Sequence, residues 1–129
     1  MSLRYSTAVR DAQLDAKEDV IGTAPLLRIY TGSSPASCAA AATGTLLVEI
    51  TLPSDWLTAA SGGSKSKVGV WSGTAGNAGT AGYYRIYEAT GTTCHEQGDV
   101  GAQMTLDDPD IADTQTVTVA SYTTSAGNG

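Results

Sequence analysis

The chain of 129 residues contains no phenylalanine, one histidine, two cysteines and two tryptophans. So few cysteines and histidines argue against a structural zinc site, which needs about four such ligands. No apolar run approaches the roughly 20 residues of a membrane-spanning helix, and the N-terminus lacks the charged-then-apolar pattern of a secretory signal. We therefore expect a soluble protein that is made without an export signal.

Basic residues are also scarce. Seven Lys and Arg residues stand against thirteen Asp and Glu residues, which gives a formal net charge of −6 and a pI near 4.4. A nucleic-acid-binding protein needs basic side chains to displace counterions from phosphate, and an anionic membrane surface makes a similar demand. We expect neither nucleic acid nor membrane as a partner.

Small residues dominate the composition: Gly, Ala, Ser and Thr make up 64 of the 129 positions. The length fits a single domain over residues 1–129, but its core must be assembled from few large apolar side chains. Such a thin core is often supplemented by burial between copies of the chain. We expect a homo-oligomer, with a trimer favoured.

One helix is predicted near the N-terminus, over residues 6–21. Ser6 or Thr7 can cap its first turn, and Gly22 is placed to end it. The remaining sequence from residue 25 to 122 is predicted to form a β-domain, and residues 123–129 a flexible tail.

The predicted helix has two sets of apolar residues. Val9, Ala12, Ala16 and Val20 recur at helical spacing and are expected to face the core. Leu14 and Ile21 lie seven residues apart on a flank of that stripe. They are interpreted either as the edge of the same core or as a contact with another subunit.

After Pro25 the hydrophobic period changes to two, as in strands. In the first run Leu27 and Ile29 are expected to share one face. In a later run the residues are expected to alternate between two faces of one strand, with one face formed by Leu46, Val48, Ile50 and Leu52 and the other by Leu47, Glu49 and Thr51. Strands are predicted over residues 26–32, 45–52, 67–71, 83–89, 93–97, 102–106 and 114–122, with a hairpin joining 83–89 to 93–97. The fold class is therefore mainly β, an antiparallel β-sandwich or barrel-like sheet with one N-terminal α-helix.

Candidate chemistry is sparse. Cys94 and His95 are adjacent, and a thiolate beside an imidazole is an activated nucleophile. Neighbouring residues of a strand point to opposite faces, however, so this pair is not expected to act together. A Cys38–Cys94 disulfide fits the cysteine count and is left open, although a chain without an export signal favours reduced thiols.

Four aspartates over residues 107–113 suggest calcium, but their spacing does not match a helix–loop–helix calcium loop, so a solvated loop is favoured. The glycine-rich residues 73–82 precede no predicted helix, which argues against a phosphate site. We therefore predict no enzyme, no catalytic residue, no metal site and no cofactor.

The aromatic residues offer a candidate contact surface. Trp56, Trp71, Tyr83 and Tyr84 could form a platform for sugars or for the surface of a partner, but core packing is favoured for most of them. One of Tyr83 and Tyr84 is expected to face outward, because they are adjacent in a strand. With Leu14 and Ile21 they complete the candidate interaction surface.

Several segments follow one another in a characteristic order, at residues 27–35, 44–52, 79–85, 91–93 and 98–101. In this order they resemble a family of small proteins encoded by tailed bacteriophages and prophages, and the similarity extends from about Tyr5 to Tyr122. The matching motifs are structural. The family has apolar residues where this chain has Cys94 and His95, which weakens a catalytic interpretation further.

The resemblance implies a non-enzymatic virion structural protein, made in the host bacterial cytoplasm and located in the virion. It would act by self-association and by docking on other capsid or tail proteins, as a head decoration (cement) protein or a tail component. The alternative is a receptor- or carbohydrate-binding module of a phage tail that uses Tyr83 and Tyr84.

Overall fold

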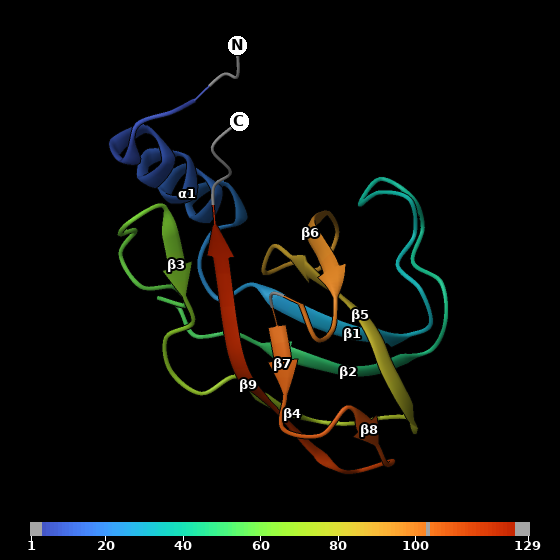
Figure 1. Ribbon diagram of the computed structural model, residues 1–129. Coiled ribbons are helices and arrows are strands. Elements are labelled where there is room, and N and C mark those ends of the chain that lie inside the picture. Colours follow the sequence, from blue (N-terminus) through green and yellow to red (C-terminus); the bar gives the residue numbers. More distant parts are fainter. Residues whose placement is uncertain (1–3, 103, 126–129) are drawn as a thin grey trace.

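Two antiparallel β-sheets pack face to face in the computed structural model, which describes residues 4–102 and 104–125 (Figure 1). The first sheet has the strand order β2-β1-β5-β6, and β8 pairs with β5; the second has the order β3-β9-β4, and β7 pairs with β9. The prediction of a mainly β protein with an N-terminal helix is confirmed, and the architecture is that of a β-sandwich. The elements are α1 (Thr7–Ile21), β1 (Leu26–Thr31), β2 (Leu46–Thr51), β3 (Ser64–Ser66), β4 (Ser72–Thr74), β5 (Gly79–Tyr87), β6 (Cys94–Asp99), β7 (Met104–Leu106), β8 (Asp110–Ile111) and β9 (Thr116–Ser125).

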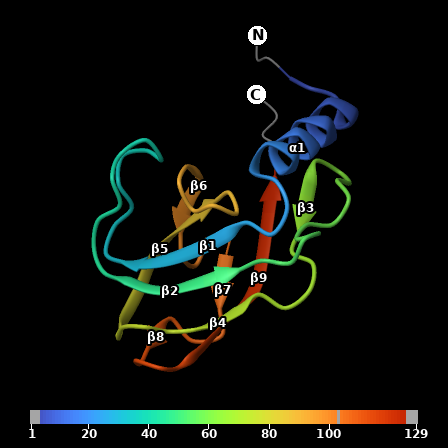
Figure 2. The same ribbon diagram turned by 180° about the vertical axis from the view of Figure 1, so that it is seen from behind.

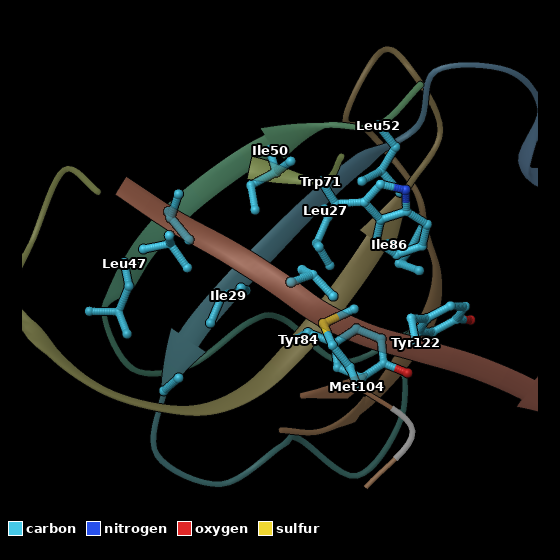
Figure 3. Packing of buried hydrophobic residues seen from close by; sticks show 14 of the residues in the cluster. Leu27, Ile29, Leu47, Ile50, Leu52, Trp71, Tyr84, Ile86, Met104 and Tyr122 are labelled. Carbon is cyan, nitrogen blue, oxygen red and sulfur yellow. The ribbon is translucent and has the colours of Figure 1, made fainter. Parts of the chain in front are cut away.

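The core lies between the sheets. Leu27 and Ile29 of β1 are fully buried, as their alternation predicted. Figure 3 shows them gathered with Ile86 and Trp71 around β9. The two tryptophans meet at 6.1 Å between ring centroids, so the few large side chains of the sequence are concentrated in one cluster.

A β-bulge alters the expected pattern of β2. Ile29 pairs with Val48 whereas Tyr30 pairs with Leu46, so Leu47 is an extra residue on β2. The prediction that Leu46 shares a face with Val48 and Ile50 is therefore wrong: Leu47 is buried as they are, and Leu46 is 37% exposed. Beyond the bulge the expected alternation holds, because a single inserted residue reverses the faces only on one side of it.

Two other expectations about strands are corrected. Residues 67–71 were expected to form a strand, but Gly69 has a φ of 75° and the Trp71 indole donates to the Val68 carbonyl at 3.0 Å, which makes a turn there. Residues 123–125 were expected in a flexible tail, but they belong to β9, and Thr124 is buried. Residues 126–129 lie outside the described part of the chain. The predicted hairpin is confirmed as β5 and β6.

Helix α1 begins and ends where the sequence predicts. The Ser6 hydroxyl accepts from the Val9 amide at 3.2 Å, and Gly22, at a φ of 89°, donates its amide to the Glu18 carbonyl. The helix lies at one end of the sandwich beside β3 and the end of β9, a placement visible from both sides in Figures 1 and 2.

Candidate functional site

The orientation of α1 about its own axis is set by charged residues. Lys65 of β3 is buried, and its ammonium group lies 2.8 Å from an Asp15 carboxylate oxygen and 2.5 Å from a Glu18 oxygen. Burial opposes the lysine charge, yet the two carboxylates outweigh it and raise the pKa of Lys65. A cation that is buried in this way needs both partners, so it holds Asp15 and Glu18 toward the sandwich.

A second group of polar residues connects α1 to both sheets. Lys17 forms an ion pair with Glu96 of β6 and donates to the Thr124 hydroxyl of β9 at 2.6 Å. The other Glu96 oxygen accepts hydrogen bonds from the hydroxyls of Tyr84 at 2.9 Å and Tyr122 at 2.6 Å. We call Lys17, Glu96, Tyr84 and Tyr122 the Glu96 cluster.

The Glu96 cluster keeps its tyrosines protonated. Burial raises the pKa of Tyr84 and of Tyr122, and the neighbouring Glu96 charge raises each further. A shallow pocket of about 290 Å³ opens over this cluster and is lined by Tyr84, Glu96, Gln97 and residues 123–125. Tyr84 and Glu96 are hydrogen-bonded to each other, and Thr124 accepts a hydrogen bond from Lys17, so the connection between helix and sheets occupies much of this lining.

One apolar stripe of α1 faces away from the sandwich. Val9 is 44% exposed and Val20 is 69% exposed, and Ala12 and Ala16 between them are exposed as well. The expectation that this stripe faces the core is therefore wrong. We call Val9, Ala12, Ala16 and Val20 the α1 outer face.

The residues predicted as an interaction surface lie inside the protein instead. Leu14 and Ile21 are each 3% exposed, so they form the inner side of α1, as the core-edge interpretation proposed. Tyr84 is 2% exposed and belongs to the Glu96 cluster, and Tyr83 is fully buried. The expectation that one of the two tyrosines faces outward is wrong.

Tyr83 is buried because the long connection between β1 and β2 covers the outer face of β5. Its ring stacks on Tyr30 with centroids 5.0 Å apart, and its hydroxyl donates to the Thr43 carbonyl at 2.6 Å. We call residues 33–45 the covering loop. Adjacent strand residues do point to opposite faces here, but both faces of β5 are covered.

The pair Cys94 and His95 is not arranged as a nucleophile and base. The Cys94 thiol donates to the Glu96 carbonyl at 3.4 Å, whereas His95 lies 3.3 Å from Glu88. Burial, and secondarily Cys38, raises the pKa of Cys94 to about 12, which favours the unreactive thiol.

The aspartates of the 107–113 loop serve as hydrogen-bond acceptors within the loop and its surroundings. Asp107 accepts from the amides of Asp108 and Thr118, and Asp108 accepts from the Asp110 amide. In residues 4–102 and 104–125 no group of three or more His, Cys, Asp or Glu residues is placed to hold a metal ion. The same residues include no helix with the length and apolar character needed to cross a membrane.

Comparisons with protein-family models, with curated proteins and with solved structures find no match to this chain. The candidate site therefore rests on geometry, and its most distinctive element is the α1 outer face. Sequence reasoning identified the residues of this stripe but assigned them to the core. It missed Lys65 and the Glu96 cluster, for which the sequence gives no signal, because their members meet only through the packing of α1 on two sheets.

Proposed function

We propose that this protein is a non-enzymatic structural component of a tailed-bacteriophage virion that self-associates through the α1 outer face and docks on the particle. The observation that carries the proposal is a second apolar stripe on α1. A helix that packs on a monomeric domain normally has one apolar face, which it turns inward. Here Leu14 and Ile21 are buried on the inner side, and the α1 outer face presents further apolar residues to solvent.

A second copy of the chain is the occupant that fits this face best. Ala12 and Ala16 at its centre allow two helix backbones to approach closely, and Val9 and Val20 at its ends supply branched side chains to bury. The helix of 15 residues is about 22 Å long, so one helix contact buries a limited area. In a ring each copy makes two such contacts, so more apolar area is buried per copy than in a dimer that uses the same face.

The charges beside the α1 outer face are bound within the chain. Asp15 pairs with Lys65, and Lys17 pairs with Glu96, so these charges hold the helix on the sandwich. The exposed apolar residues of the helix are what a second copy would bury, and the trimer expected from the sequence stays a prediction.

The phage-like motifs of the sequence support the assignment to a virion, and the proposed self-association suits a component of a particle. Small symmetric oligomers of this kind can sit on the symmetry axes of a larger assembly, as a head decoration protein or a tail component does. The alternative of a carbohydrate-binding module loses its basis, because Tyr83 and Tyr84 are both buried.

The test compares two Ala→Glu variants of the full chain. Ala16→Glu places a charge at the centre of the α1 outer face, and Ala78→Glu makes the same change at an exposed position just before β5. We expect Ala16→Glu to lower the solution mass to that of a monomer while its circular dichroism is unchanged, and Ala78→Glu to keep the wild-type mass. If both variants keep the wild-type oligomer, the α1 outer face is not the interface.

The virion role is tested separately by mass spectrometry of purified particles from the phage that encodes the chain. We expect the wild-type protein in stoichiometric amount and Ala16→Glu at a strongly reduced level. Particles that lack the wild-type protein would contradict the virion role even if the oligomer forms.

A further inference from the structure

The covering loop is fastened to the outer face of β5 and β6 by polar contacts to its backbone. Arg85 is 2% exposed, and one of its terminal nitrogens donates to the carbonyls of Ser37 at 3.2 Å and Ala40 at 2.8 Å. The Gln97 amide donates to the Pro35 carbonyl at 2.6 Å. Residues 35–40 are thereby held over one place on the sheet.

These contacts bring Cys38 to the part of the sheet where Cys94 lies. Cys38 lies between the two residues whose carbonyls bind Arg85, and Cys94 pairs with Tyr87, whose hydroxyl is 3.4 Å from the Arg85 guanidinium. Both cysteines are reduced and half-buried, so each remains within reach of a small reagent. The contribution of Cys38 to the raised pKa of Cys94 is a further sign that the two thiols are neighbours.

We propose that Cys38 and Cys94 are an intramolecular disulfide site that locks the covering loop onto β6. The bond would join a loop to a strand 56 positions away along the chain. The loop contacts Tyr83 and Arg85, so the bond would fix the loop over the part of β5 that these two residues occupy. This site goes beyond the proposed self-association, since it lies on a different element from α1.

The chemistry is a thiol–disulfide exchange with an external disulfide such as glutathione disulfide. The Cys38 thiolate attacks one sulfur of the reagent, its S–S bond breaks, and the first glutathione leaves as a thiolate that takes up a proton. The Cys94 thiol then loses its proton, attacks the Cys38 sulfur and expels the second glutathione. Two protein thiols are oxidised and one glutathione disulfide is reduced to two thiols.

The test is to incubate the reduced, purified full-length protein with glutathione disulfide and digest it with trypsin without reduction. Trypsin cleaves after Lys and Arg, so Cys38 lies in the peptide 29–65 and Cys94 in the peptide 86–129. We expect these two peptides to be joined within one chain. Cys38→Ser, which keeps the backbone carbonyls that bind Arg85, is the matched control and should yield no linked peptide.

Two further measurements distinguish a disulfide that restrains the covering loop from one that has no effect on it. Oxidation should slow elastase cleavage in the alanine run 39–42 at least about tenfold, because the loop can no longer open locally. It should also raise the melting temperature by roughly 10 °C, the scale expected for closing a loop of this length. Glutathione adducts on both cysteines, cross-links only between chains, or a melting temperature that falls on oxidation would each overturn the proposal.

Discussion

Replacing Glu96 by Gln should destabilise the protein more than a substitution near the surface usually does. Glu96 accepts two tyrosine hydrogen bonds on one carboxylate oxygen and an ion pair on the other. A hydrogen bond to a charged group contributes about 1.5–3 kcal/mol and a neutral one about 0.5–1.5, so neutralising Glu96 costs about 1 kcal/mol for each tyrosine. The partly exposed pair with Lys17 adds at most about 1 kcal/mol. We expect a total loss of about 3 kcal/mol.

Urea unfolding followed by tryptophan fluorescence measures this loss, since Trp56 and Trp71 are both buried. All variants are compared at one protein concentration, because self-association adds to the apparent stability. Glu49→Gln is the matched control: Glu49 is exposed and pairs with Arg28 on the sheet surface, so it should cost less than about 1 kcal/mol. Equal losses for Glu96→Gln and Glu49→Gln would refute the argument that Glu96 connects the helix to both sheets.

Two further predictions concern the tyrosines and a glycine contact. The pKa values of Tyr84 and Tyr122 are raised above 10.0 in the folded protein, so the unfolded chain loses these protons first. The free energy of unfolding is therefore at its full value below pH 10. Above pH 10 it falls by up to about 1.4 kcal/mol per pH unit for each tyrosine. Urea titrations at several alkaline pH values should show this decline, and a shallower one in the double Tyr→Phe variant; equal slopes would contradict it. Gly82→Ala would place a methyl carbon 1.9 Å from the Gly32 carbonyl oxygen and should lower the free energy of unfolding by at least about 3 kcal/mol. Gly76→Ala is the control, because no heavy atom lies within 4 Å of the added carbon, and its stability should stay within about 1 kcal/mol of wild type. Thermal unfolding measures both. A mild effect of Gly82→Ala would show that β5 can move away from β1.

The sequence predicted those features that local chemistry determines. Ser6 and Gly22 define the ends of α1, and the alternation of Leu27 and Ile29 places β1 in the core. Turn residues around 90–92 predict the β5–β6 hairpin, which the structure confirms. Each of these signals acts over a few residues, so no knowledge of the rest of the fold is needed.

Features that depend on distant partners escaped prediction. The apolar period of α1 assigns Val9 and Val20 to the core, but the ion pairs of Lys65 and Lys17 with residues far along the chain reverse that assignment. The bulge at Leu47 arises in the pairing of two strands and leaves no mark on the period of either. One of Tyr83 and Tyr84 was expected at the surface, because nothing in a loop of small residues signals that the loop folds back over β5 and covers Tyr83.

Light scattering coupled to size exclusion, at several concentrations of the wild-type protein, tests the central claim most directly. We expect a mass that is a fixed multiple of the 13.1 kDa chain, with a trimer favoured, and that does not change on dilution across the measured range. A clean monomer at every concentration would contradict self-association through the α1 outer face.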